Sequence, residues 1–328
     1  MQIRPITTLC AALLLAFAIV CASANAAAES LAANLYVVQN DPSTGVGRVL
    51  QLPTGEQGGA WQGGPKTLLS TPTETSLGAV TTDAAGNLYV SSLGTSDSAS
   101  YAVTEYVVSS KDTVTRTRTL TNMPSVASAI AVDASGQVYT VNGSSISVYA
   151  ASATGSAAPV RTITGASTLL NAPTAIAVDG VGNLYVANAE AGNVLVFSAA
   201  ANGDVAPNRT IAGVTTGITQ PWGVAVDAAG DLFVTTSASF APAMTARILE
   251  FAPGAAGDVA PIRTINVTSP NVASGIAVDA AGNLYASLTN ASTLQLSVGV
   301  YATDSASLAQ TITASAWTAT KDAQIAVR

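Results

Sequence analysis

A twelve-residue segment recurs along the chain, and its recurrence limits the possible folds more than any other feature. It reads AIAVDASGQVYT at residues 129–140 and returns downstream as AIAVDGVGNLYV, GVAVDAAGDLFV and GIAVDAAGNLYA, while a looser copy, AVTTDAAGNLYV, starts at residue 79. The copies share an aspartate, and successive aspartates are 50, 46, 48 and 52 residues apart. Repeats of this length are supersecondary units that bury a core only by stacking on their neighbours.

Each copy is interpreted as a β-hairpin, because two stretches of alternating apolar residues flank a short Asp-x-x-Gly turn. Apolar residues at alternate positions, such as Ile176 and Val178, share one face of a strand. The glycine fits the left-handed position of the turn, and the aspartate can accept hydrogen bonds from turn amides. We therefore predict a structural role for the aspartates, with ligand binding as the alternative; they are Asp83, Asp133, Asp179, Asp227 and Asp279.

Two further strands follow each hairpin, and each of them occurs six times. The third strand ends in a bulky residue, which is Leu52, Tyr106, Tyr149, Phe197, Phe251 or Tyr301. The fourth has one equivalent polar position, occupied by Lys66, Arg118, Arg161, Arg209, Arg263 and Gln310. We expect the positive residues to form a dispersed ring on the outermost strands, where charge commonly protects exposed sheet edges.

The sixth hairpin is divided between the two ends of the sequence. Residues 34–37 repeat the second strand as NLYV, and residues 324–328 repeat the first strand as QIAVR. No turn joins these two strands, so Ala33 stands at the glycine position and Arg328 at the aspartate position. The sequence therefore predicts an all-β fold. It is a six-bladed β-propeller of four-stranded antiparallel blades, whose ring closes by pairing the C-terminal strand with the N-terminal strands.

The repeat unit resembles the NHL-type propeller family, whose blades carry a hairpin of the form GIAVD-x-x-GN-L/I-YV. The resemblance covers nearly all of residues 27–328, which we treat as a single domain. It implies the propeller fold but not one function, because such propellers serve as protein-binding platforms, RNA-binding surfaces and lyases. More distantly, the chain resembles the gluconolactonase-like propellers, which are metal-dependent hydrolases.

The first 26 residues have the features of a cleavable export signal. Arg4 lies in a short polar start, an apolar run extends over residues 9–20, and small residues end at Ala26. We expect cleavage after Ala26 and a secreted or periplasmic protein. A buried helix is one alternative, and a lipoprotein attached at Cys21 is another. No other run approaches the length of a membrane span, so no integral membrane segment is expected.

Composition excludes several kinds of chemistry. The chain has no histidine, so Ser-His-Asp triads and histidine-ligated zinc sites are excluded. Its two cysteines, Cys10 and Cys21, both lie in the predicted export signal. Only 9% of residues are charged and the net charge is -7, so no basic stripe is available for nucleic acid or anionic lipid.

One face of the predicted propeller is the better candidate for function. It carries the connections from second to third strands and from fourth strands to the next blade, which differ in length and sequence, and variable loops on a fixed scaffold commonly carry recognition. Trp222 and Trp317 lie in these connections, where an aromatic ring can stack on a sugar, peptide or partner surface, or pack between blades. Polar residues just after second strands are candidate ligand-binding residues near the channel mouth, with strand-end capping as the alternative; they are Asn40, Asp41, Asn142, Asn188 and Glu190.

Two functions remain open at this stage. The first is a non-enzymatic binding or scaffold module, monomeric and without a cofactor, which holds a protein, a glycan or a cell-envelope ligand through its variable loops. The second is a lactone or ester hydrolase of the gluconolactonase-like type. In that case Glu190 or Asp41 would serve as ligand or base, with Ca²⁺ or Mg²⁺, since hard cations prefer oxygen ligands.

Overall fold

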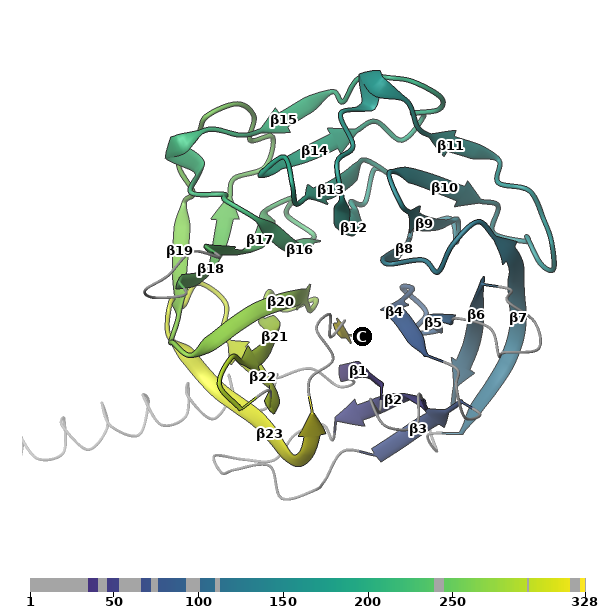
Figure 1. Cartoon of the computed structure of the whole chain (residues 1–328), viewed down its shortest axis with the longest axis horizontal. Coiled ribbons are helices and arrows are strands. Elements are labelled where there is room, and N and C mark those ends of the chain that lie inside the picture. Colours follow the sequence, from purple (N-terminus) through teal and green to yellow (C-terminus); the bar gives the residue numbers. More distant parts are fainter. Residues whose placement is uncertain are drawn as a thin grey trace, which may run out of the picture.

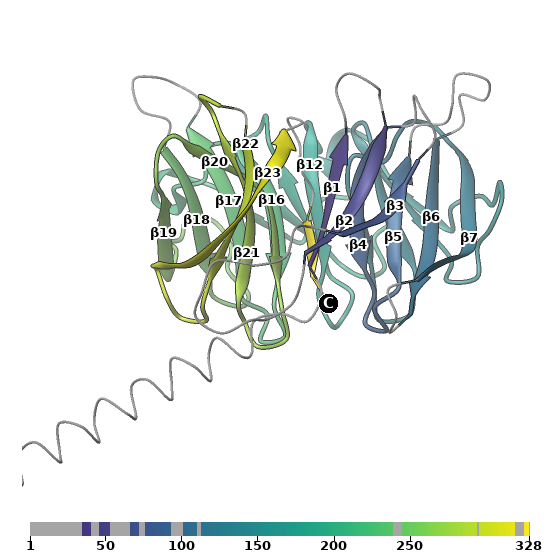
Figure 2. The ribbon, with the colours of Figure 1, turned by 90° about the horizontal axis from the view of Figure 1, so that it is seen from below.

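The computed structural model describes residues 35–40, 46–52, 66–71, 76–92, 101–109, 113–238, 245–293, 295–318 and 325–327. These residues form six four-stranded antiparallel sheets. The sheets stand around a central axis like the blades of a propeller (Figures 1 and 2). The predicted all-β fold with six blades is thereby confirmed.

The first three blades use the N-terminal half of the chain and the last strand. Blade A contains β24 (Ile325–Val327), β1 (Leu35–Asn40), β2 (Gly47–Leu52) and β3 (Lys66–Ser70). Blade B contains β4 (Leu77–Thr82), β5 (Leu88–Ser92), β6 (Tyr101–Val108) and β7 (Val114–Met123). Blade C contains β8 (Ile130–Val132), β9 (Val138–Asn142), β10 (Ser145–Tyr149) and β11 (Arg161–Ile163).

The other three blades are, like blades B and C, each built from one continuous segment. Blade D contains β12 (Pro173–Val178), β13 (Leu184–Asn188), β14 (Asn193–Phe197) and β15 (Arg209–Ile211). Blade E contains β16 (Pro221–Val226), β17 (Leu232–Ala238), β18 (Thr245–Phe251) and β19 (Arg263–Val267). Blade F contains β20 (Asn271–Val278), β21 (Leu284–Asn290), β22 (Gln295–Tyr301) and β23 (Leu308–Thr318).

Helical structure is limited to single turns in the described residues. The 3-10 helices η1 (Ala166–Thr168) and η2 (Val214–Thr216) lie in the connections that enter blades D and E. Among the described residues, no helix is long enough and apolar enough to span a membrane.

The ring closes in blade A, as the sequence predicts. β24 pairs with β1 in antiparallel register, with Leu35 opposite Val327 and Val37 opposite Ile325. The Thr82 hydroxyl of blade B donates a 2.9 Å hydrogen bond to the Val327 carbonyl. The closing strand is thus held by its own sheet and by the neighbouring blade.

The core is divided among the blade junctions, because alternate side chains of a strand point to opposite sheet faces. Ile176 of β12 packs between blades C and D, whereas Ala175 of the same strand packs between blades D and E. Every junction has a cluster of this kind. Each blade is therefore stabilised by both of its neighbours, and the innermost strands are left bordering the axis.

Outer strands receive a further contact from the following blade. The connection between the third and fourth strands of blade D crosses the edge of β11, where Gly203 forms a parallel bridge with Ile163. Gly155 and Gly257 make the same bridge at β7 and β15. The Gly203 amide donates to the Thr162 carbonyl at 2.7 Å. These sheet edges are covered by backbone, in addition to any effect of charge.

Candidate functional site

The axis of the propeller holds a channel with a volume of about 230 Å³. Its walls are the innermost strands of all six blades, represented by segments such as Ala175–Val178, Gly223–Val226 and Ile325–Val327. No charged side chain is found among the described residues that line it. Each innermost strand is paired on one side only, so its other edge turns backbone N–H and C=O groups toward the channel.

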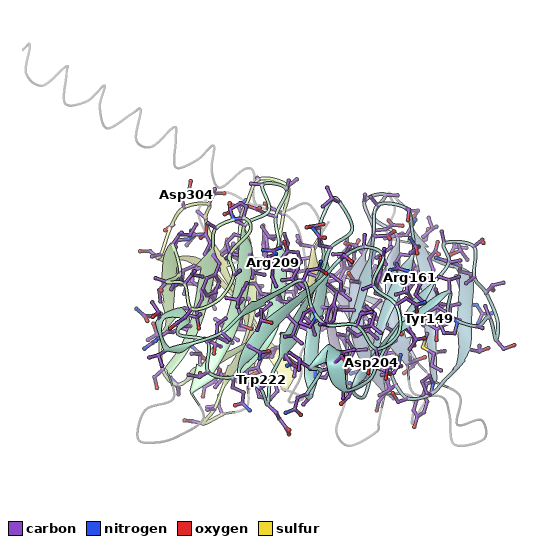
Figure 3. The ribbon with its side chains drawn as sticks, turned by 90° about the horizontal axis from the view of Figure 1, so that it is seen from above. Tyr149, Arg161, Asp204, Arg209, Trp222 and Asp304 are labelled. Carbon is purple, nitrogen blue, oxygen red and sulfur yellow. The ribbon has the colours of Figure 1, made fainter. Side chains whose placement is uncertain are left out.

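Four innermost strands begin with a β-bulge. The register with the second strand shifts in β4, β12, β16 and β20, and the extra residue of β12 is Thr174 while that of β16 is Trp222. The bulged residue of β12 contacts the next blade, because the Thr174 hydroxyl donates to the Pro221 carbonyl of β16 at 3.0 Å. Trp222 is partly exposed. It lies on the propeller face opposite Asp304, which is the face of the variable connections (Figure 3).

The asparagines predicted as ligands make hydrogen bonds that fix local structure. The Asn40 side chain joins two blades, because its Nδ2 donates to the Leu77 carbonyl at 2.7 Å and its Oδ1 accepts from the Leu77 amide at 2.8 Å. Asn188 is fully buried, accepts from the Asn171 amide at 2.6 Å and donates to the Leu169 carbonyl at 3.0 Å. Both side chains cap strand ends and hold the adjacent connections.

Asn142 and Glu190 occupy different environments. The Asn142 amide donates to the Thr140 hydroxyl at 2.8 Å, and its buried Oδ1 has no hydrogen-bond partner in the described part of the protein. Glu190 is exposed in the turn between β13 and β14. Asp41 and the side chain of Trp317 lie outside the described residues.

These predicted residues do not form one site. The asparagines belong to blades A, C and D, and none of the described candidates is among the residues that line the channel. Within the described ranges, no three acidic, histidine or cysteine side chains are grouped so that they could hold a metal ion. The turn that carries Glu190 does approach the connection that enters blade E, because a Cβ on Gly192 of that turn would lie 2.7 Å from the Thr219 carbonyl oxygen.

The opposite face carries the Asp-x-x-Gly turns. In blade D the Asp179 carboxylate accepts from the amides of Val181 and Asn183 at 3.1 and 2.8 Å, and from the Asn183 side chain at 2.8 Å. The Tyr185 hydroxyl also donates to this carboxylate, at 3.4 Å. The same arrangement recurs at Asp83, Asp133 and Asp279. The aspartates organise the turns from which the second strands start.

The arginines of the fourth strands have a role that the sequence interpretation missed. Arg161 lies over the Tyr139 ring, 5.7 Å from its centroid, and donates to the Tyr139 hydroxyl at 3.1 Å. It also donates to the carbonyl oxygens of Ala199 and Ala201 in blade D. Arg118 and Arg209 make corresponding contacts with Tyr89 and Tyr185 and with the next blade. These half-buried arginines join adjacent blades, so the expected edge-protecting ring is wrong for them.

This blade-joining unit of turn aspartate, second-strand tyrosine and fourth-strand arginine affects tyrosine ionisation. Burial raises the pKa of Tyr89 to about 12, against the smaller lowering by the Arg118 hydrogen bond. Burial likewise raises the pKa of Tyr139. The hydroxyls therefore remain protonated donors to the turn carboxylates over the physiological range.

Blade E departs from this unit. Phe233 replaces the tyrosine and Asp231 replaces the asparagine or glutamine of the other turns. Arg263 pairs with the buried Glu250 and donates to the Ser305 carbonyl at 3.1 Å. Burial is the main reason that the pKa of Asp231 is raised, with further contributions from Asp227 and Asp304. The junction of blades E and F thus concentrates negative charge.

Comparisons with known proteins support the fold alone. No protein family matches the sequence, and no curated protein is detectably similar to it. Among solved structures, a protein of unknown function from Bacteroides caccae has a TM-score of 0.58 at 9% identity, covering 90% of this chain and 99% of the other. A putative 6-phosphogluconolactonase from Bacteroides uniformis has a TM-score of 0.54 at 14% identity, covering 86% and 83% of the two chains. A Lactobacillus plantarum protein has a TM-score of 0.53 at 15% identity, with the same coverage.

Proposed function

We propose that this protein is an exported, NHL-like propeller that acts as a non-enzymatic binding module through the face of its variable connections. One observation carries the proposal. The repeated residues of the turn face hold the scaffold together, whereas the bulge position at the other face carries a different residue in different blades, including Trp222. Differences among blades at one face are what a ring needs in order to recognise an asymmetric partner.

The connections at this face also differ in reach. β9 and β10 are joined by Gly143 and Ser144 alone, whereas β5 ends at Ser92 and β6 begins only at Tyr101. The hydrolase alternative would need carboxylates that converge on one point. The described carboxylates instead serve the turns and the arginine contacts, except for exposed ones such as Glu190.

Directional coupling tests which face binds. Two variants, Ala281→Cys at an exposed turn tip and Glu190→Cys on the other face, each carry one cysteine for coupling. They attach the purified protein to a surface in opposite orientations. We expect cell-envelope polysaccharides, peptidoglycan fragments or a defined envelope protein to be retained only by the protein coupled through residue 281. Equal retention in both orientations would contradict the assignment of the face, and turnover in a panel of lactones would favour the hydrolase.

Export is tested separately, by the mass of the protein recovered from outside the cytoplasm. We expect a chain that begins at Ala27. A mass that includes a diacylglyceryl group on Cys21 would show the lipoprotein alternative, and recovery of the full-length chain from the cytoplasm would refute export.

A further inference from the structure

We infer that the channel mouth beside Trp222 is a binding site for a neutral sugar ring. The inference deepens the proposed binding function and rests on it. Its starting point is backbone geometry: Trp222 is the extra residue of a bulge, placed between the pairs Pro221–Thr236 and Gly223–Thr235. The next residue, Gly223, already lines the channel. The indole is therefore carried by the part of β16 that borders the opening.

The indole is available for contact. Trp222 is only partly buried. Its indole N–H makes no hydrogen bond to the described residues, and the nitrogen is accessible to solvent. An aromatic face beside a free N–H donor suits the pyranose ring, whose axial hydrogens form an apolar face and whose hydroxyls accept hydrogen bonds.

The bulge position carries a large side chain in blade E and small ones in other blades. The residues that correspond to Trp222 in the repeats of blades B, C, D and F are Gly78, Ser128, Thr174 and Ser274. Two of these small side chains are engaged within the scaffold, since the Thr174 hydroxyl donates to the Pro221 carbonyl at 3.0 Å and the Ser274 hydroxyl contacts that of Ser287 at 2.9 Å. Trp222 therefore supplies the aromatic contact for a planar group that approaches from the variable face.

Charge and polarity of the channel select the ligand class. A charged ligand would lose water without gaining a partner, because the described lining residues carry no charge. A purely apolar ligand would cover the free backbone N–H and C=O groups of the innermost strands without satisfying them. The volume of about 230 Å³ lies below the range of drug-sized pockets, so it suits one small ring. A neutral, hydroxyl-rich ring meets all three conditions.

Titration with defined saccharides tests this inference. The probes are the neutral disaccharides cellobiose, maltose, chitobiose and mannobiose, with digalacturonate as the acidic comparison, followed by tryptophan fluorescence and by saturation-transfer NMR. We expect at least one neutral disaccharide to bind, Trp222→Ala to weaken that binding at least tenfold, and Trp222→Phe to retain most of it. Val214→Ala, at a side chain that is 97% exposed on η2, is the matched control and should bind as the parent does.

Each contrary result has a defined meaning. Absence of binding by all neutral probes, unchanged binding by a folded Trp222→Ala variant, or tighter binding of digalacturonate would each overturn the sugar site. The proposed function would still stand if the directional coupling experiment retained an envelope protein through the same face. Only failure of both experiments would remove the binding module as well.

Discussion

Arginine is well suited to the junction between two blades, because one planar guanidinium can stack on a ring and donate in several directions at once. Arg161 uses both properties. It stacks on Tyr139 within its own blade and donates to carbonyl groups of the next blade. A lysine at this position would keep the charge but not the fork of donors.

Replacing Arg161 tests the energetic weight of this contact. Arg161→Ala leaves the Ala201 carbonyl and the Tyr139 hydroxyl without their donor, so we expect a loss of about 1.5 to 3 kcal/mol in unfolding free energy. Denaturant unfolding measures it. Arg116→Ala, at an exposed arginine of β7, is the control and should change stability by less than about 0.5 kcal/mol. Equal effects of the two substitutions would refute the blade-joining role.

Asp231 is a second residue-scale exception, with a measurable pH signature. In the turns of blades B, D and F an asparagine side chain donates to the aspartate, as Asn183 does to Asp179 at 2.8 Å, and in blade C a glutamine does so. Asp231→Asn should add this hydrogen bond and remove a negative charge. We expect the variant to be more stable at neutral pH by about 0.5 to 1 kcal/mol, in the range of consensus substitutions.

The stability gained by Asp231→Asn should depend on pH in a defined direction. Because the folded pKa of Asp231 is raised, protonation favours the folded state, and this contribution is lost as pH rises through the folded pKa. The stability difference between Asp231→Asn and the parent should therefore shrink toward acidic pH, as followed by thermal melts between pH 3 and 8. A difference that is constant over this range would contradict the raised pKa.

Sequence reasoning succeeded best where the interactions are local. Asp179 bonds to amides two and four residues away, so the turn pattern alone indicates its partners. Arg161 donates to the Ala199 carbonyl, which belongs to another repeat. Whether such an arginine joins two blades or protects a sheet edge depends on the direction of its side chain, which the sequence does not show. The asparagines show the same limit, since Asn40 bonds to Leu77 of the next blade.

At the level of single elements, the hairpin turns show where glycine is required. Gly182 has a φ of +89°, and a Cβ there would lie 2.9 Å from the Ala199 Cβ. Gly143, in the turn between β9 and β10, has a φ of +61° with nothing within 4 Å of its added Cβ. The first position combines backbone strain with a steric conflict, whereas the second has the strain alone.

These two turns allow a matched substitution. Gly143→Ala should cost about 1 to 2 kcal/mol of unfolding free energy through the left-handed backbone, and Gly182→Ala should cost more because Ala199 must also move. Chemical denaturation of both variants provides the comparison. The steric account fails if Gly182→Ala proves the milder change.

The bulges mark the limit of what the repeat pattern predicts for an element. The sequence places Trp222 directly before a first strand, but an extra residue in that strand cannot be distinguished from the end of a loop without the cross-strand register. The structure pairs Pro221 and Gly223 with consecutive residues of β17 and so assigns Trp222 to the bulge. The candidate site depends on that single shift.

For the whole molecule, ring closure depends on a short strand. β24 has three residues, of which Ile325 and Ala326 are buried. Deletion of residues 324–328 removes the innermost strand of blade A and exposes the apolar cluster that contains Leu35 and Leu50. We expect the melting temperature to fall by about 10 °C or more, because several apolar side chains lose their burial.

Calorimetry of the truncated protein measures this loss, and addition of a peptide that carries residues 324–328 is the control. Recovery of thermal stability with the peptide would show that the pairing itself, and not the shorter chain, is responsible. An unchanged melting curve after truncation would be incompatible with closure by β24.

The position of β24 also determines when each blade can fold during synthesis. Blades B to F each use strands from one stretch of chain, so each can form once its own segment has been synthesised. Blade A alone waits for Ile325–Val327, because its partner Leu35 lies at the other end of the sequence. Contacts of such long range form slowly. A nascent chain therefore remains an open, incomplete ring until β24 has been synthesised, a delay that would suit the export proposed above.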